Sequence, residues 1–101
     1  MKARSGMRPV HPGEILRDEL ETLGLSANAL SKALDVPVNR ITAILNGQRG
    51  VTANTALRLA RYFGTTPQVW LNLQTAYELR RAEIEVGRQI AERVKPRQTA
   101  A

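Results

Sequence analysis

The chain has 101 residues, enough for one small domain. With 43% hydrophobic and 24% charged residues it has an ordinary globular composition, which excludes a collagen-like, a largely disordered or a multidomain protein. Its 15 Lys and Arg against 9 Asp and Glu give a net charge of +6, and this balance favours a polyanionic partner such as nucleic acid.

The residue types that are missing exclude several kinds of chemistry. Without cysteine the chain forms no disulfide or thiolate metal site, and a single histidine cannot build an imidazole metal cage. No catalytic constellation and no glycine-rich phosphate loop is found, so we expect no enzyme, no cofactor and no metal. No apolar run approaches the length of a membrane span and no secretory segment is present. We therefore expect a cytoplasmic protein without a membrane segment.

The predicted elements begin after a tail. Residues 1–10 are predicted to be flexible and basic, because they combine Lys and Arg with Ser, Gly and Pro and show no periodicity. Met7 within this tail is an alternative start. A first helix is predicted from Pro12, which suits a first helical position, with His11 as its entry residue and Gly24 as its stop. Its apolar stripe is formed by Leu16, Leu20 and Leu23.

Two short helices follow. Ser26 is predicted to cap the second helix, and Asp35 ends it. Pro37 is predicted to start the third helix, which ends at Asn46 and Gly47. The inward-facing residues of these two helices are predicted to be Leu30, Leu34, Ile41, Ile44 and Leu45.

Two further helices complete the predicted domain, which spans residues 11–79. Thr52 is predicted to cap the fourth helix, and Gly64 stops it. Thr66 followed by proline starts the fifth helix, whose pattern fades after about Leu79. Its core positions, with those of the fourth helix, are predicted to be Leu57, Ala60, Phe63, Val69, Trp70, Leu73 and Tyr77. No segment alternates with a period of two, so the predicted class is all-α.

Residues 80–95 are predicted to be a C-terminal helical extension, and residues 96–101 a disordered tail. The extension is a candidate dimer seam, although a helix that folds back onto its own domain is an equal alternative. The residues of the seam approximate one stripe: Leu73, Tyr77, Ile84, Ala91 and Val94.

The segment 25–45 carries the functional signal. Two short amphipathic helices joined by a tight break are typical of a helix-turn-helix motif, whose second helix enters the major groove of DNA. Ser31 stands where the two helices approach, so a small side chain is needed there. Asp35 stands at the turn position that glycine usually fills, and the turn requires a left-handed backbone there. The alternative is a plain helical hairpin with a solvated outer face.

Residues outside the core of this motif are predicted to contact DNA. Asparagine and arginine bond to adenine and guanine, and small apolar groups contact the thymine methyl. The predicted base-reading residues are Val38, Asn39, Arg40, Thr42 and Ala43. The predicted phosphate-binding residues are Ser26, Asn28, Lys32, Asn46, Arg49, Thr52 and Asn54.

The distribution of charge supports this interpretation. Residues 36–77 contain no Asp or Glu, whereas they contain four arginines. A carboxylate in this region would repel the DNA backbone, so its absence favours a surface that faces phosphates.

The run 11–73 resembles the HigA-type antitoxins, also called VapI-like proteins, which belong to the phage-repressor-like (Xre-type) helix-turn-helix class. The resemblance covers about two thirds of the chain and is carried by HPGEIL at 11–16, VPVNRI at 36–41, NGQRGVTANTALRLARYFGTTPQVWLNLQ at 46–74, and AYELR just after. The resemblance implies a five-helix phage-repressor-like domain with a C-terminal helical extension.

The resemblance also implies a function and partners. Such proteins are bacterial antitoxins of type II systems, which bind and neutralise a HigB-type toxin, an mRNA endonuclease, and repress their own operon as dimers on palindromic double-stranded DNA. Two alternatives remain: a free-standing Xre-like repressor without a toxin, and a helical adaptor or RNA-associated protein with a basic face. A neighbouring gene for a small basic nuclease would distinguish the antitoxin from the free-standing repressor.

One face of the first helix is acidic. Glu14, Asp18 and Glu21 recur at i, i+4 and i+7, away from the leucine stripe. A solvated face is the simple interpretation. The sharper hypothesis is a docking site for a basic partner, such as an RNA-cleaving toxin.

Overall fold

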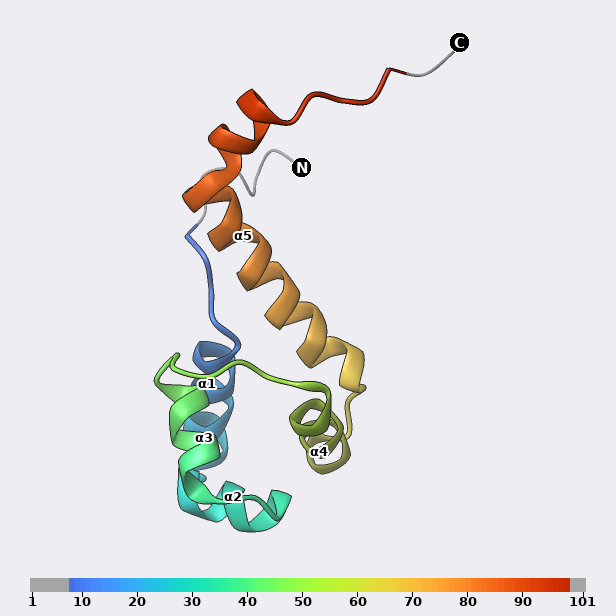
Figure 1. Ribbon diagram of the computed structural model, residues 1–101. Helices are drawn as coiled ribbons and strands as arrows, with labels where there is room; N and C mark the ends of the chain where they lie inside the picture. Colours follow the sequence, from blue (N-terminus) through green and yellow to red (C-terminus); the bar gives the residue numbers. More distant parts are fainter. Residues whose placement is uncertain (1–7, 99–101) are drawn as a thin grey trace.

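The computed structural model describes residues 8–98, which form five α-helices joined by short loops, with no β-strand in that range (Figure 1). The helices are α1 (Pro12–Leu23), α2 (Ala27–Leu34), α3 (Val38–Leu45), α4 (Ala53–Phe63) and α5 (Pro67–Arg93). The predicted all-α class and its five helices are therefore confirmed. No helix of this part of the chain is both long and apolar enough to cross a membrane.

The first four helices and the start of α5 pack into one unit, from which the rest of α5 projects (Figure 1). α3 packs against α1 and α2, and α4 packs against α5. The molecule is elongated, with principal extents of 56 × 26 × 23 Å and a radius of gyration of 17.1 Å. A compact chain of this length would have a radius near ~13 Å, so the projecting helix dominates the shape.

Apolar side chains from all five helices form one core. Its buried members are Leu16, Leu20, Leu30, Leu34, Ile41, Ile44, Val51, Ala56, Leu59 and Trp70. Burial of each large aliphatic side chain stabilises the fold by roughly 1.5–3 kcal/mol. The inward faces predicted for α2 and α3 are confirmed, with Leu45 packing at the edge of the core.

Three predicted core residues are exposed instead. Leu23, Leu57 and Val69 are 54%, 59% and 47% exposed. Leu23 is the last residue of α1 and precedes the left-handed C-cap Gly24. Leu57 follows the buried Ala56, and Val69 precedes the buried Trp70. Neighbouring residues in an α-helix are about 100° apart around its axis, so Leu57 and Val69 point away from the core side of their helices. The periodic pattern predicted the correct helices and most of their core positions, such as Ala60 and Trp70, but missed at these three residues.

Most predicted helix starts carry a capping side chain. The side chains of His11, Ser26 and Thr66 each accept a hydrogen bond from a backbone N–H in the helix that follows. Thr52 occupies the N-cap position of α4, but its side chain makes no capping hydrogen bond. Pro37 is the N-cap of α3 rather than its first helical residue, because its backbone is extended (ψ 146°). At the other ends of α1 and α4, the predicted stops Gly24 and Gly64 adopt positive φ values of 64° and 72°.

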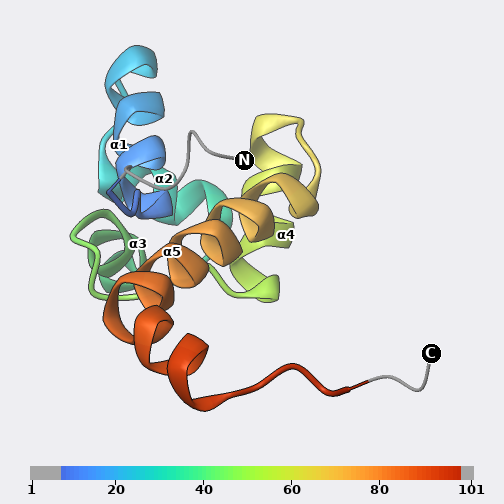
Figure 2. The same cartoon turned by 90° about the horizontal axis from the view of Figure 1, so that it is seen from above.

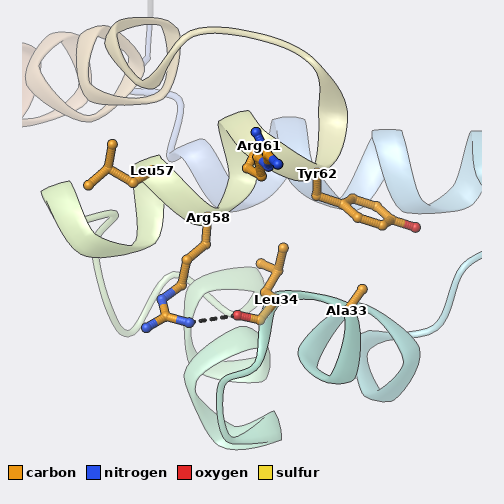
Figure 3. Close-up of a pocket in the computed structure, with 6 residues that line it drawn as sticks. All are labelled: Ala33, Leu34, Leu57, Arg58, Arg61 and Tyr62. Atoms are coloured by element: carbon orange, nitrogen blue, oxygen red, sulfur yellow. Dashed lines mark hydrogen bonds between the residues drawn. The ribbon is translucent and has the colours of Figure 1, made fainter.

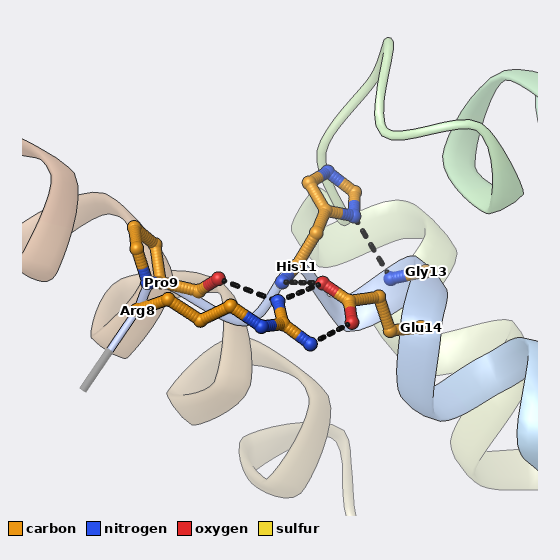
Figure 4. A network of polar contacts seen from close by, with 5 residues as sticks. All are labelled: Arg8, Pro9, His11, Gly13 and Glu14. Atoms are coloured by element: carbon orange, nitrogen blue, oxygen red, sulfur yellow. Dashed lines mark hydrogen bonds and ion pairs between the residues drawn. The ribbon is translucent and has the colours of Figure 1, made fainter.

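The start of α1 is held by a polar network (Figure 4). Glu14 Oε2 accepts a hydrogen bond from the backbone N–H of His11 at 3.2 Å, and the carboxylate pairs with the Arg8 guanidinium at 2.8 and 3.0 Å. Hydrogen bonds from Arg8 lower the pKa of Glu14 to about 2. The His11 ring is buried, and its Nδ1 accepts a hydrogen bond from the Gly13 N–H at 2.9 Å. Its ring centroid lies 4.8 Å from that of Tyr77, and burial lowers the pKa of His11.

α5 continues without a break to Arg93, and the fading of its apolar pattern after Leu79 coincides with the exposed second half of the helix. The predicted extension 80–95 is the second half of this same helix and its C-cap, and the boundary proposed at 79 falls inside a helix. The 27 residues of α5 form a rod of roughly 40 Å.

The end of this helix does not fold back onto the domain. Residues 81–98 are exposed apart from the half-buried Gly87, and Figure 2 shows the end of α5 standing clear of α1 to α4. Residues 94–98 have no regular secondary structure. The remainder of the two predicted tails, 1–7 and 99–101, lies outside the described residues.

α1 and α3 cross at Gly13 with no room for a side chain. A Cβ atom on Gly13 would collide with the backbone carbonyl of Ile44. Because Ile41 and Ile44 are completely buried, this crossing sets the depth at which α3 sits on the domain.

We expect Gly13→Ala to lower the free energy of unfolding by roughly 1–3 kcal/mol, because the added methyl group overpacks the crossing. In the matched control, Gly87→Ala should raise it by about 0.5–1 kcal/mol, because alanine favours a helix and a Cβ there meets no atom nearer than 3.9 Å. Urea unfolding followed by circular dichroism measures both. Equal effects of the two substitutions would contradict the close crossing.

Stability should decrease as the pH falls from 7 to 5. The pKa of His11 is lower in the folded than in the unfolded protein, so protonation favours unfolding. The stabilisation by neutral His11 is complete above the unfolded pKa of about 6.5 and is lost as the pH falls from there through the lower folded pKa. His11→Asn keeps a capping oxygen but cannot titrate, and should flatten the decrease. Chemical denaturation at both pH values tests this, and an equally steep decrease in the variant would refute it.

Candidate nucleic-acid interface

α2 and α3 form a helix-turn-helix unit whose turn comprises residues 35–37. Asp35 ends α2 in the left-handed conformation (φ 59°, ψ 51°), as the motif predicts for this position. The Val36 N–H donates to the Ser31 carbonyl at 3.0 Å, and Val36 packs against the core. Ser31 is only 3% exposed, which confirms that a small side chain stands between the two helices. Local chemistry and core packing together fix the direction of α3.

The outer face of α3 carries the predicted base-reading residues. Val38 is 42% exposed and Asn39 is exposed, both at the N-terminal end of the helix. Thr42 and Ala43 are half-buried one turn further on, and Thr42 Oγ1 donates to the Asn39 carbonyl at 3.3 Å. The N-terminal end of α3 is therefore its most accessible part.

Arg40 has a different environment from its neighbour Asn39. It is half-buried, and its Nη1 donates to Asn54 Oδ1 in α4 at 3.0 Å. Its Nε is buried and has no hydrogen-bond partner in the described part of the chain. Part of the Arg40 guanidinium is thus committed to α4 rather than to solvent.

The predicted phosphate-binding residues are all exposed: Ser26, Asn28, Lys32, Asn46, Arg49, Thr52 and Asn54. They lie at the start of α2 and within it, in the loop after α3 and at the start of α4. Some already have partners within the chain. Ser26 Oγ accepts from a backbone N–H of α2, and Asn46 Oδ1 accepts from Arg17 at 3.4 Å.

Two arginines that were not predicted as site residues donate hydrogen bonds to backbone carbonyls at the C-terminal ends of α2 and α3. Arg58 Nη1 donates to the Leu34 carbonyl at 2.8 Å (Figure 3) and to the Asp35 carbonyl at 3.1 Å. Arg17 Nη2 donates to the Leu45 carbonyl at 3.0 Å. These carbonyls end α2 and α3, where the helix dipole favours a cation. In the sequence Arg58 was visible only as one charge among others, and nothing marked Arg17.

The structure divides the acidic face of α1. Glu14 is half-buried and engaged with Arg8 and His11, whereas the side chains of Asp18 and Glu21 are exposed and have no hydrogen bond within residues 8–98. Across the same range, no cluster of three or more His, Asp or Glu residues is placed to hold a metal ion.

Known proteins share this helix-turn-helix fold. The helix-turn-helix family profile (HTH_3) matches residues 16–70. Virulence-associated protein I from Dichelobacter nodosus is 59% identical over 81 residues, which span 79% of this chain and 75% of that protein. The structure of an addiction module antidote protein of the HigA family from Coxiella burnetii has a TM-score of 0.89 and 58% identity, over 90% of this chain and 100% of that chain.

Another solved structure contains DNA. Antitoxin HigA from Pseudomonas aeruginosa, with the higBA promoter, has a TM-score of 0.87 and 46% identity, over 90% of this chain and 100% of that chain. These similarities confirm the resemblance to HigA-type antitoxins and the helix-turn-helix fold predicted from the sequence. They also agree with a regulatory protein rather than an enzyme.

Proposed function

This chain belongs to the helix-turn-helix family, and we propose that it is the DNA-binding antitoxin of a type II toxin–antitoxin system. In this proposal it neutralises a HigB-type mRNA endonuclease toxin and represses its own operon as a dimer in the cytoplasm. The observation that carries the proposal is the exposed N-terminal end of α3, which stands in a region free of carboxylates. The same fold occurs in an antitoxin whose structure was solved with a promoter.

The exposed end of α3 offers groups that read base edges in the major groove. The Asn39 amide can bond bidentately to adenine, and the methyl groups of Val38 and Thr42 suit the thymine methyl. Arg40 can donate to guanine with its remaining guanidinium nitrogen. Ala43 is small and allows close approach to the bases.

The surrounding residues would hold the duplex backbone. Ser26 and Thr52 are the N-caps of α2 and α4, and the first backbone N–H groups of these helices can donate to phosphate oxygens. The side chains of Lys32 and Arg49 are exposed cations that make no hydrogen bond to the described residues. These contacts would fix the position of the protein without reading sequence.

A dimer would use the projecting half of α5. A single recognition helix contacts few base pairs, whereas a two-fold dimer presents two such helices to half-sites about 34 Å apart. Leu73 and Tyr77 of the predicted seam are half-buried against the domain, but Ile84, Ala91 and Val94 are exposed. We propose these last three as the seam, because they leave an apolar stripe uncovered in one protomer.

Operator binding gives the main test. Asn39→Ala should relax the preference at particular base pairs at a cost of about 1–3 kcal/mol, because it removes a base contact. Arg49→Ala should weaken all duplexes by a similar factor and reduce the salt slope by about 1, because it removes a phosphate contact. Fluorescence anisotropy between about 50 and 200 mM salt, with the region upstream of the chain's own operon, measures both.

Two results would contradict this assignment. If Asn39→Ala and Arg49→Ala behave alike, α3 is not the reading helix. If the wild-type protein binds random duplexes as tightly as an inverted repeat from its upstream region, it is not a dimeric repressor.

The toxin contact is proposed at Asp18 and Glu21. An RNA-cleaving toxin is expected to be basic, and these carboxylates are exposed, whereas Glu14 is already paired with Arg8. This surface of α1 belongs to a different element from the reading helix, so one protomer could engage DNA and toxin through separate surfaces.

Charge reversal tests the toxin contact. We expect Asp18→Lys and Glu21→Lys each to weaken toxin binding by roughly tenfold, because like charges then oppose each other. Glu92→Lys is the control, since it makes the same charge change on an exposed residue near the end of α5. Isothermal titration with the toxin from the neighbouring gene measures the affinities. Unchanged affinity in both α1 variants would refute the contact, and the lack of any such gene would favour a free-standing repressor.

A further inference from the structure

Asn54 joins two arginines of the helix-turn-helix region. Its Oδ1 accepts a hydrogen bond from Arg40 Nη1 at 3.0 Å and another from Arg58 Nε at 2.9 Å. Asn54 lies in the first turn of α4, while Arg40 lies in α3. One neutral oxygen therefore orients two guanidinium groups from different helices.

Arg58 connects this oxygen to the turn. Its Nη1 donates to the last carbonyl of α2, that of Leu34 (Figure 3), and also to the carbonyl of Asp35. Within residues 8–98, Asp35 is the single residue other than glycine that adopts a positive φ. Consecutive hydrogen bonds thus run from the turn through Arg58 and Asn54 to Arg40.

The consequence falls on Arg40. A free arginine side chain samples many rotamers, so an exposed one has no single direction. Here Nε is buried without a partner and Nη1 is bound to Asn54, which leaves Nη2 as the nitrogen that is neither buried nor bonded to another described residue. Without the oxygen of Asn54, the half-buried guanidinium would lose its hydrogen bond and adopt other rotamers.

We propose that Asn54 and Arg58 are positioning residues for operator specificity. Arg58 anchors Asn54 to the helix-turn-helix turn, and Asn54 sets the direction from which Arg40 reaches the DNA. This inference rests on the proposed function, because it requires α3 to read base pairs. It assigns to Asn54 a role in sequence preference, beyond the phosphate contact proposed above.

The test compares base preferences rather than affinity alone. The probes are the duplex that the wild-type protein selects from a randomised pool and the single base-pair variants of that duplex. We expect Arg40→Ala to reduce discrimination at one or two positions by about fivefold or more. Asn54→Ala and Arg58→Met should reduce discrimination at these same positions, and Asn54→Ala combined with Arg40→Ala should cause no further loss.

Two control variants separate positioning from charge. Asn54→Asp keeps an acceptor oxygen, so the preference should persist, although the added negative charge weakens binding to every duplex. Arg61→Met removes an exposed charge from the same helix as Arg58 and should lower all affinities evenly. Thermal unfolding of each variant reports on folding. If Arg58→Met does not fold, Arg58→Lys replaces it, because lysine keeps the charge but lacks the planar fork that joins the two carbonyls to Asn54.

The outcomes are distinct. Uniform weakening by Asn54→Ala and Arg58→Met, with the base preferences intact, would overturn the inference, since a structural or phosphate-binding role predicts that result. Additive effects of Asn54→Ala and Arg40→Ala, or unchanged preferences in Arg40→Ala alone, would also overturn it. A wild-type protein that selects no duplex would instead overturn the proposed function.

Discussion

The crossing of α1 and α3 at Gly13 determines where the outer face of α3 can be. An isolated helix of eight residues is not stable in water, so α3 depends on the domain for its shape as well as its position. Gly13 lets the backbone of α1 approach that of Ile44, and the buried Ile41 and Ile44 then hold the inner side of α3. The accessible residues at its start, Val38 and Asn39, occupy their place as a result of that packing.

Arginine side chains provide a second level of order around the same helices. Arg17 and Arg58 donate to backbone carbonyls at the C-terminal ends of α3 and α2. These positions need a cation or a donor, and Arg58 lies in the stretch 36–77, which contains no Asp or Glu that would compete for its guanidinium group. The positive charge of this region therefore has two effects: it secures the frame of the motif and makes its surface attractive to a polyanion.

Local signals made much of this fold predictable, and non-local contacts account for what was not. Ser26 and Gly64 mark helix ends because capping and left-handed turns depend on neighbouring residues alone. The apolar pattern fades after Leu79 because the projecting part of α5 packs against no core of its own protomer, and pairs such as the one between Arg81 and Glu85, 2.9 Å apart, support the helix there. At the site, the spacing of the apolar residues in α3 predicted that Val38 and Asn39 are exposed. The bond from Arg40 to α4 spans 14 residues and became visible only in three dimensions.

Because α5 is uninterrupted, it restricts which insertions and deletions the chain can accept between the core and the far end of the helix. Each residue inserted into an α-helix advances everything beyond it by about 1.5 Å and rotates it by about 100°. The stripe formed by Ile84, Ala91 and Val94 is thus locked in phase with Trp70, which anchors the same helix in the core. Insertions and deletions along this rod would swing the far stripe out of alignment unless they came in steps close to whole turns.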